Sequence, residues 1–146
     1  MSKKYYLTMG VMATLFLVVA WGCSAKGRPS DTVLTFISAV KNSDAAGIEK
    51  TLMIEKLLLE KEGDSYLKLP PEARKVEEES FKKNLIANLT TGNLRSFGQI
   101  DPKVSEEEVS GEDAKVLITD IKNNKSYLFA LEKEGGAWKI FRISPA

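Results

Sequence analysis

Residues 114–143, AKVLITDIKNNKSYLFALEKEGGAWKIFRI, decide the fold of this chain. Apolar side chains recur at every second position through three short segments, a period that is typical of β-strands. The predicted strands cover residues 114–121, 126–133 and 138–143. Val116 and Ile118 share one face of the first strand, and the core face of the third is predicted to carry Trp138 and Ile140. The dipeptides 123–124 and 135–136 are tight-turn sequences, so these strands are predicted to pair antiparallel.

Two further strands are predicted upstream of this stretch. Residues 104–110 form a largely polar strand, joined to the next one through a turn at Gly111. Residues 94–100 are predicted as the first strand, in which Gly98 marks a bulge or a bend. The expected sheet is therefore an antiparallel meander.

Helical spacing of apolar residues dominates the part of the chain before Gly92. A first amphipathic helix is predicted over residues 31–41, with Ser30 as its N-cap. A second is predicted to begin after Ser43 or Asp44, and the helical path continues through residues 57–59. The longest helix starts at residues 70–71, ends near residue 90 and presents a row of apolar side chains: Val76, Phe81, Leu85, Ile86 and Leu89. Helices followed by strands indicate an α+β domain.

Residues 1–23 have the layout of an export signal. Lys3 and Lys4 precede an uncharged run that ends at Cys23, the single cysteine of the chain. The tetrapeptide 20–23, AWGC, resembles the lipobox of bacterial lipoproteins. That resemblance implies cleavage before Cys23 and a lipid on its thiol. An uncleaved transmembrane anchor and cleavage after Ala25 are the alternatives.

The resulting division of the chain is a signal peptide over residues 1–22, a lipidated tether over 23–29 and an α+β domain over 30–146. All three interpretations of the signal place the domain outside the cytoplasm, facing the periplasm or the exterior. Ser24 after the cysteine favours the outer membrane if the organism has one.

Composition excludes several classes of function. The 21 basic and 20 acidic residues leave the chain nearly neutral, so nucleic acid is not expected as a partner. The chain has no histidine, which removes the commonest general base near neutral pH and the commonest metal ligand. One cysteine cannot form an intramolecular disulfide.

The two ends of the domain resemble one family. Residues 29–33 (PSDTV) with Phe36, and the closing phrase 136–140 (GAWKI), are similar to small bacterial lipoproteins of a domain-of-unknown-function family with the nuclear transport factor 2-like (cystatin-like) fold. The resemblance implies a bent sheet that wraps the helices as a cone and leaves a cavity at one end. Members of this fold class include isomerases, dehydratases and pure binding modules.

The candidate chemistry is sparse. An isomerase-like site would need a carboxylate base and a tyrosine in an apolar cavity, and the candidates are Asp120 and Tyr127, with Tyr66 and Asp101 in reserve. We favour the interpretation of Asp120 as a strand-end turn residue and of Tyr127 as a half-buried strand aromatic. The acidic clusters 77–79, 106–108 and 112–113 lack the spacing of a calcium loop, and no cofactor or metal is predicted.

The sequence therefore predicts a lipid-anchored, non-catalytic module that contacts the membrane through lipid on Cys23. Its expected partner is a small apolar ligand or a protein. An enzyme using Asp120 with Tyr127 or Tyr66 is the second hypothesis, and a homodimer formed through the sheet face is the third. Leu57, Leu58 and Leu59 could be core, a cavity mouth or an exposed patch.

Overall fold

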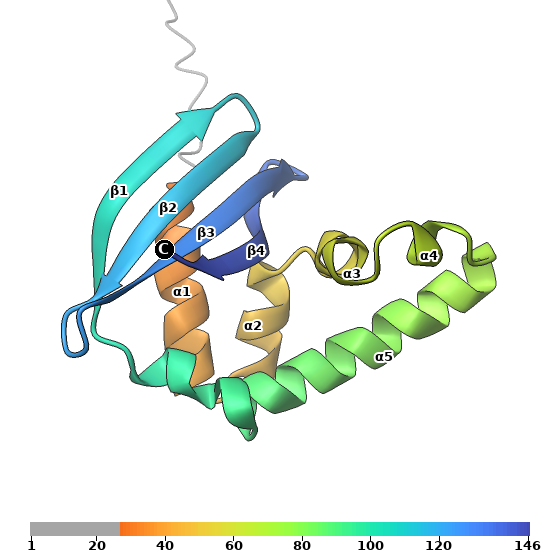
Figure 1. Cartoon of the computed structure of the whole chain (residues 1–146), viewed down its shortest axis with the longest axis horizontal. Coiled ribbons are helices and arrows are strands. Elements are labelled where there is room, and N and C mark those ends of the chain that lie inside the picture. The colour runs from red at the N-terminus through yellow and green to blue at the C-terminus, as the bar shows by residue number, and fades with distance from the viewer. Residues whose placement is uncertain (1–26) are drawn as a thin grey trace, which may run out of the picture.

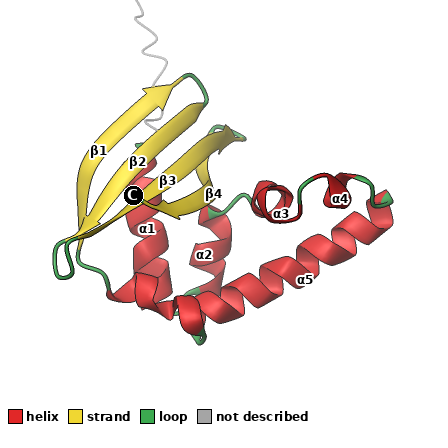
Figure 2. Ribbon diagram, viewed as in Figure 1, coloured by secondary structure: helices red, strands yellow, loops and turns green. Residues whose placement is uncertain are grey.

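A computed structural model describes residues 27–146 (Figure 1). Six helical elements precede four strands, which confirms the α+β class (Figure 2). The helical elements are α1 (Pro29–Lys41), α2 (Ala45–Thr51), α3 (Ile54–Glu62), α4 (Asp64–Leu67), α5 (Pro71–Thr90) and the 3₁₀ helix η1 (Asn93–Gln99). The strands are β1 (Pro102–Ser110), β2 (Asp113–Asp120), β3 (Lys125–Glu134) and β4 (Ala137–Pro145). The predicted signal segment and Cys23 lie outside the described residues.

The sheet is a simple meander in the order β1-β2-β3-β4, with every neighbouring pair antiparallel. The four strands predicted over residues 104–143 are thereby confirmed. Two irregularities interrupt the register, one between Val104 and Glu106 on β1 and one beside Ala130 and Leu131 on β3. Such bulges increase the local twist of a strand, and Figure 1 shows the sheet bending over α1.

The main core lies between α1 and one face of the sheet. Phe36 of α1 and Phe129 of β3 are both fully buried, and their rings meet edge to face with centroids 6.3 Å apart. The predicted core face of β4 is confirmed, because Trp138 and Ile140 are buried. Of the two faces that the sequence left open on β2 and β3, the structure buries the one with Val116, Ile118, Phe129 and Leu131. The free edge of β4 is covered at its middle, where Leu52 pairs with Ile140.

The prediction of a strand over residues 94–100 is wrong, because this segment forms η1. Leu94, Phe97 and Ile100 recur every third residue, the repeat of a 3₁₀ helix, and Phe97 and Ile100 pack against the core. Gly98 marks a close approach of two backbones: a Cβ placed there would lie 2.5 Å from the Lys41 nitrogen. The segment therefore continues the helical half of the chain and packs against the end of α1.

The start of α1 also differs from the prediction. The helix begins at Pro29, one residue inside the predicted tether, so Ser30 is not the N-cap. The Asp31 carboxylate instead accepts the backbone N–H of Arg28 at 2.9 Å. The backbone N–H of Ser30 donates to the Glu107 carboxylate of β1 at 2.8 Å, which joins the first turn to the sheet. Of the two residues predicted to precede the second helix, Ser43 and Asp44, the structure has Asp44 as the N-cap: its carboxylate accepts the Gly47 N–H at 3.0 Å.

Helices α3 and α4 and the first half of α5 form an arm beside the sheet (Figure 1). Leu58 and Tyr66 are buried in the arm, and Leu57 packs against the main core, so the leucine run is core rather than an exposed patch. Val76, predicted to lie on the apolar face of the long helix, is 71% exposed. The Arg142 guanidinium of β4 donates twice to the Glu60 carboxylate of α3, at 3.1 and 2.7 Å, and fixes the arm to the sheet.

Candidate functional site

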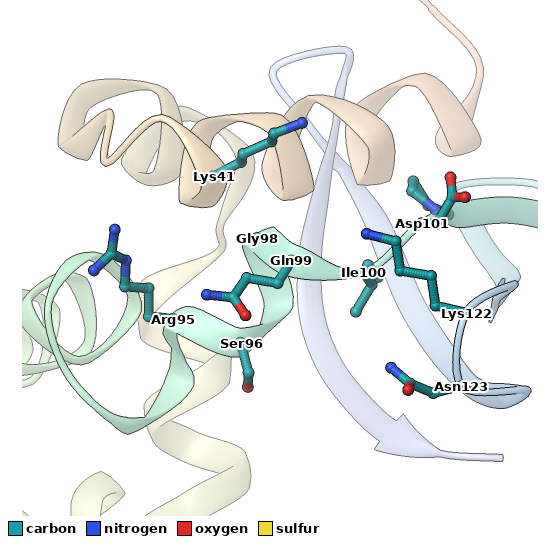
Figure 3. A pocket seen from close by; sticks show the side chains of 10 residues that line it. Lys41, Arg95, Ser96, Gly98, Gln99, Ile100, Asp101, Lys122 and Asn123 are labelled. Atoms are coloured by element: carbon teal, nitrogen blue, oxygen red, sulfur yellow. The ribbon is translucent and has the colours of Figure 1, made fainter.

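A hollow of about 800 Å³ opens between the last turn of α1, η1 and the turn that joins β2 to β3 (Figure 3). We refer to it as the basic hollow, because Lys41, Arg95 and Lys122 contribute cationic side chains to its lining. The rest of the lining consists of Ser96, Gly98, Gln99, Ile100, Asp101, Pro102 and Asn123. It lies at the end of α1 opposite to Arg28, where the chain enters the domain.

Asp120, at the end of β2, holds two walls of the basic hollow together. One carboxylate oxygen accepts the backbone N–H of Asp101 at 3.0 Å and that of Lys122 at 3.2 Å. The other oxygen accepts the side-chain amide of Asn123 at 2.6 Å. The carboxylate thus fixes the β2–β3 turn and the segment between η1 and β1 relative to each other.

The same hydrogen bonds determine the charge of Asp120. The hydrogen bond from the Asp101 N–H lowers the pKa of the Asp120 carboxyl below its usual value. Smaller contributions in the same direction come from the Asn123 amide and the Lys122 N–H, and burial opposes them in part. The side chain is buried and ionised at neutral pH, with both oxygens engaged. A general base must reach and accept a substrate proton with a pKa matched to that task. This geometry therefore favours the interpretation of Asp120 as a strand-end turn residue.

The other candidate residues are divided between the two halves of the molecule. Tyr127 lies on β3 opposite Ile118, two pairs before the pair of Asp120 with Lys125, and its half-buried ring packs on Phe97 with centroids 5.3 Å apart. Tyr66 lies in the arm, where its hydroxyl donates to the Glu78 carboxylate. Burial and this carboxylate raise the pKa of Tyr66 to about 12. The structure thus brings Asp101 and Asp120 together, and Tyr66 belongs to a different cluster.

The cationic side chains of the basic hollow were missed by reasoning from the sequence. Lys41, Arg95 and Lys122 come from three elements that are far apart along the chain, and each residue by itself looks like an ordinary surface cation. Topology alone brings them to one hollow. None of them forms an ion pair within residues 27–146.

Two searches for other chemistry within the described part of the chain give negative findings. No group of three or more acidic, histidine or cysteine side chains there could hold a metal ion. No helix among residues 27–146 is long and apolar enough to cross a bilayer.

Replacing Asp120 by asparagine is expected to lower the free energy of unfolding at neutral pH. It should also make that free energy vary less with pH in the acid range. The folded-state pKa of Asp120 lies below its unfolded value of about 3.9. The contribution of the ionised carboxylate to the free energy of unfolding is therefore present above the unfolded pKa and is lost as the pH falls through the folded pKa. Urea midpoints measured from pH 7 to pH 3 test this prediction. The matched control is Asp113→Asn, an exposed residue at the other end of β2. Equal pH slopes for wild type and Asp120→Asn would contradict the prediction.

Comparison of the chain with protein-family models, with curated proteins and with solved structures gives no match.

Proposed function

We propose that this protein is a lipid-anchored, extracytoplasmic binding protein that takes its ligand in the basic hollow and does not transform it. The anchor rests on the lipobox-like residues before Cys23. The finer fold assignment, the nuclear transport factor 2-like cone, is part of the proposal and rests on the family resemblance at the two ends of the domain. The observation that carries the binding role is an open hollow with cationic side chains that form no ion pair within residues 27–146.

The position of the basic hollow fits a tethered protein. Arg28 and the first turn of α1 lie at one end of the helix, and Lys41 lies at the other. A helix of 13 residues spans about 20 Å. A lipid attached at Cys23 would hold the first end near the membrane and leave the basic hollow facing the aqueous phase.

The engagement of the Asp120 carboxylate favours binding over turnover. The two oxygens of Asp120 accept N–H donors that shape the hollow, and the exposed Asp101 is the other carboxylate beside it. The lining is more polar than the apolar cavity expected from the sequence, so the proposed ligand is polar rather than apolar.

Replacing Cys23 by serine tests the anchor. We expect the variant to lose labelling by radioactive fatty acid and to leave the membrane fraction, because serine offers no thiol to the lipid donor. Ser24→Ala, which alters the next residue and keeps the thiol, serves as the control and should be labelled like wild type. Equal labelling of wild type and Cys23→Ser would refute the lipid anchor.

Backbone NMR spectra of the full-length chain in a neutral detergent test the binding role. Neutral, cationic and anionic small molecules are added in turn, and the signals of Gly98, Gln99 and Lys122 report on the basic hollow. Shifts confined to these signals, with the added compound recovered unchanged, support the proposal. If no compound shifts any of these three signals, the binding role is contradicted.

A further inference from the structure

The basic hollow gathers positive charge that the rest of the fold does not neutralise. Some cations of residues 27–146 pair with carboxylates, as Arg142 does with Glu60, and single exposed lysines such as Lys75 do not. The basic hollow differs because three cations without an ion pair in this part of the chain line one hollow. In the basic hollow three cationic side chains meet the exposed carboxylate of Asp101 and the buried carboxylate of Asp120 behind the lining, so one positive charge is left over. An anionic ligand would supply the missing partners.

The cations are spread across the hollow rather than placed at one point. Figure 3 shows Arg95 and Lys122 on opposite sides of Gln99, with Lys41 on a third side. They come from η1, the β2–β3 turn and the last turn of α1, respectively. A single small anion would meet one of these sides, whereas a ligand with two separated anionic groups could meet both Arg95 and Lys122.

The remaining lining offers contacts for the middle of such a ligand. The Ser96 hydroxyl and the Gln99 and Asn123 amides are neutral groups that can donate hydrogen bonds, and the Asp101 carboxylate can accept one from a ligand hydroxyl. The volume of about 800 Å³ is within the usual range for small-molecule sites, about 300–1,000 Å³. A lone inorganic phosphate would leave most of this space unfilled.

We propose that the basic hollow binds a small molecule with two separated oxyanion groups, of which a bisphosphate is the type. This inference rests on the proposed binding function and names the class of ligand. The Arg95 guanidinium suits one oxyanion because its planar N–H groups can form paired hydrogen bonds, and the Lys122 ammonium suits the other. Because the basic hollow is at the end of α1 opposite to Arg28, the source is a soluble molecule rather than a headgroup of the anchoring membrane.

Titration calorimetry of the full-length chain in a neutral detergent tests this, with bisphosphoglycerate as the probe. Glycerol phosphate, with one anionic group, and uncharged glycerol are the comparison compounds. We expect bisphosphoglycerate to bind about tenfold more tightly than glycerol phosphate, since a second charge-assisted contact is formed, and its affinity to fall as salt is added. Glycerol should give no heat of binding.

Charge-removing variants separate a built site from general attraction. Arg95→Gln and Lys122→Gln should each weaken bisphosphoglycerate about tenfold. The controls Lys75→Gln and Lys83→Gln remove the same charge from exposed positions on α5 that form no ion pair within the described residues. Equal weakening by the control and hollow variants would overturn the inference. The inference would also be overturned if the protein bound mixed micelles containing phosphatidylglycerol in preference to bisphosphoglycerate, and if bisphosphoglycerate did not displace those micelles.

The two proposals fail in different ways. If neutral or cationic compounds move the NMR signals of the basic hollow and bisphosphoglycerate binds nowhere, the anion inference is wrong and the binding function stands. If no compound of any charge moves those signals, both are wrong.

Discussion

Replacing Phe129 by alanine is expected to lower the free energy of unfolding by roughly 3–5 kcal/mol, the usual cost of removing a fully buried phenylalanine. Phe129 is inaccessible to solvent, and its ring meets that of Phe36 at an interplanar angle of 66° between the sheet and α1. Alanine would leave a cavity between these two layers, because a close-packed core collapses only in part. Since single domains are stable by only about 5–15 kcal/mol, the loss is a large part of the total.

Urea unfolding followed by circular dichroism measures this effect, and Phe141→Ala is the matched control. Phe141 is a half-buried phenylalanine of β4, and the Lys56 ammonium lies 3.9 Å from the centre of its ring. Its truncation removes a surface cation–π contact and little packing, so the expected cost is below about 1.5 kcal/mol. A smaller cost for Phe129→Ala than for Phe141→Ala would show that the core does not lie between α1 and this face of the sheet.

The sheet and its core were predictable because their signals are local. Alternating side chains along each strand and tight turns between strands set both the pairing and the buried face. Trp138 and Ile140 are therefore buried where the alternation places them. Local signals also located α5: the prolines at 70–71 mark its start, and Gly92 follows its end.

The basic hollow was not predictable, because no local pattern links its parts. Lys41 and Lys122 are separated by most of the domain, and they line one hollow only because α1 ends where the β2–β3 turn lies. The sequence predicted Asp120 as a strand-end turn residue. Its bond to the Asp101 N–H, however, depends on the path of the chain out of η1.

The strand prediction for residues 94–100 failed for a related reason. A segment of seven residues with apolar side chains at its start, middle and end fits either a strand or a short 3₁₀ helix. The choice is made by Gly98, which can lie against the backbone of α1 as no larger residue can. Contact between distant segments decides this element, and single-sequence periodicity does not report on such contact.

Replacing Gly98 by alanine is consequently expected to cost roughly 1–3 kcal/mol, the range for forcing an extra methyl group into a packed interior. The new Cβ would lie 2.5 Å from the Lys41 nitrogen and 2.6 Å from its Cα. Both are backbone atoms at the end of α1, so no flexible side chain can move aside, and η1 must shift away from the helix.

Because Gly98 and Lys41 both line the basic hollow, this shift should also change the hollow. We expect Gly98→Ala to lower the urea midpoint and to weaken bisphosphoglycerate binding together. The control is Asn93→Ala, an exposed position of the same 3₁₀ helix that does not line the basic hollow, where the cost should stay within about 0.5 kcal/mol. If Gly98→Ala were as stable as wild type, η1 would not be packed against α1. The close approach of Gly98 to Lys41, two residues that line the basic hollow, would then be absent.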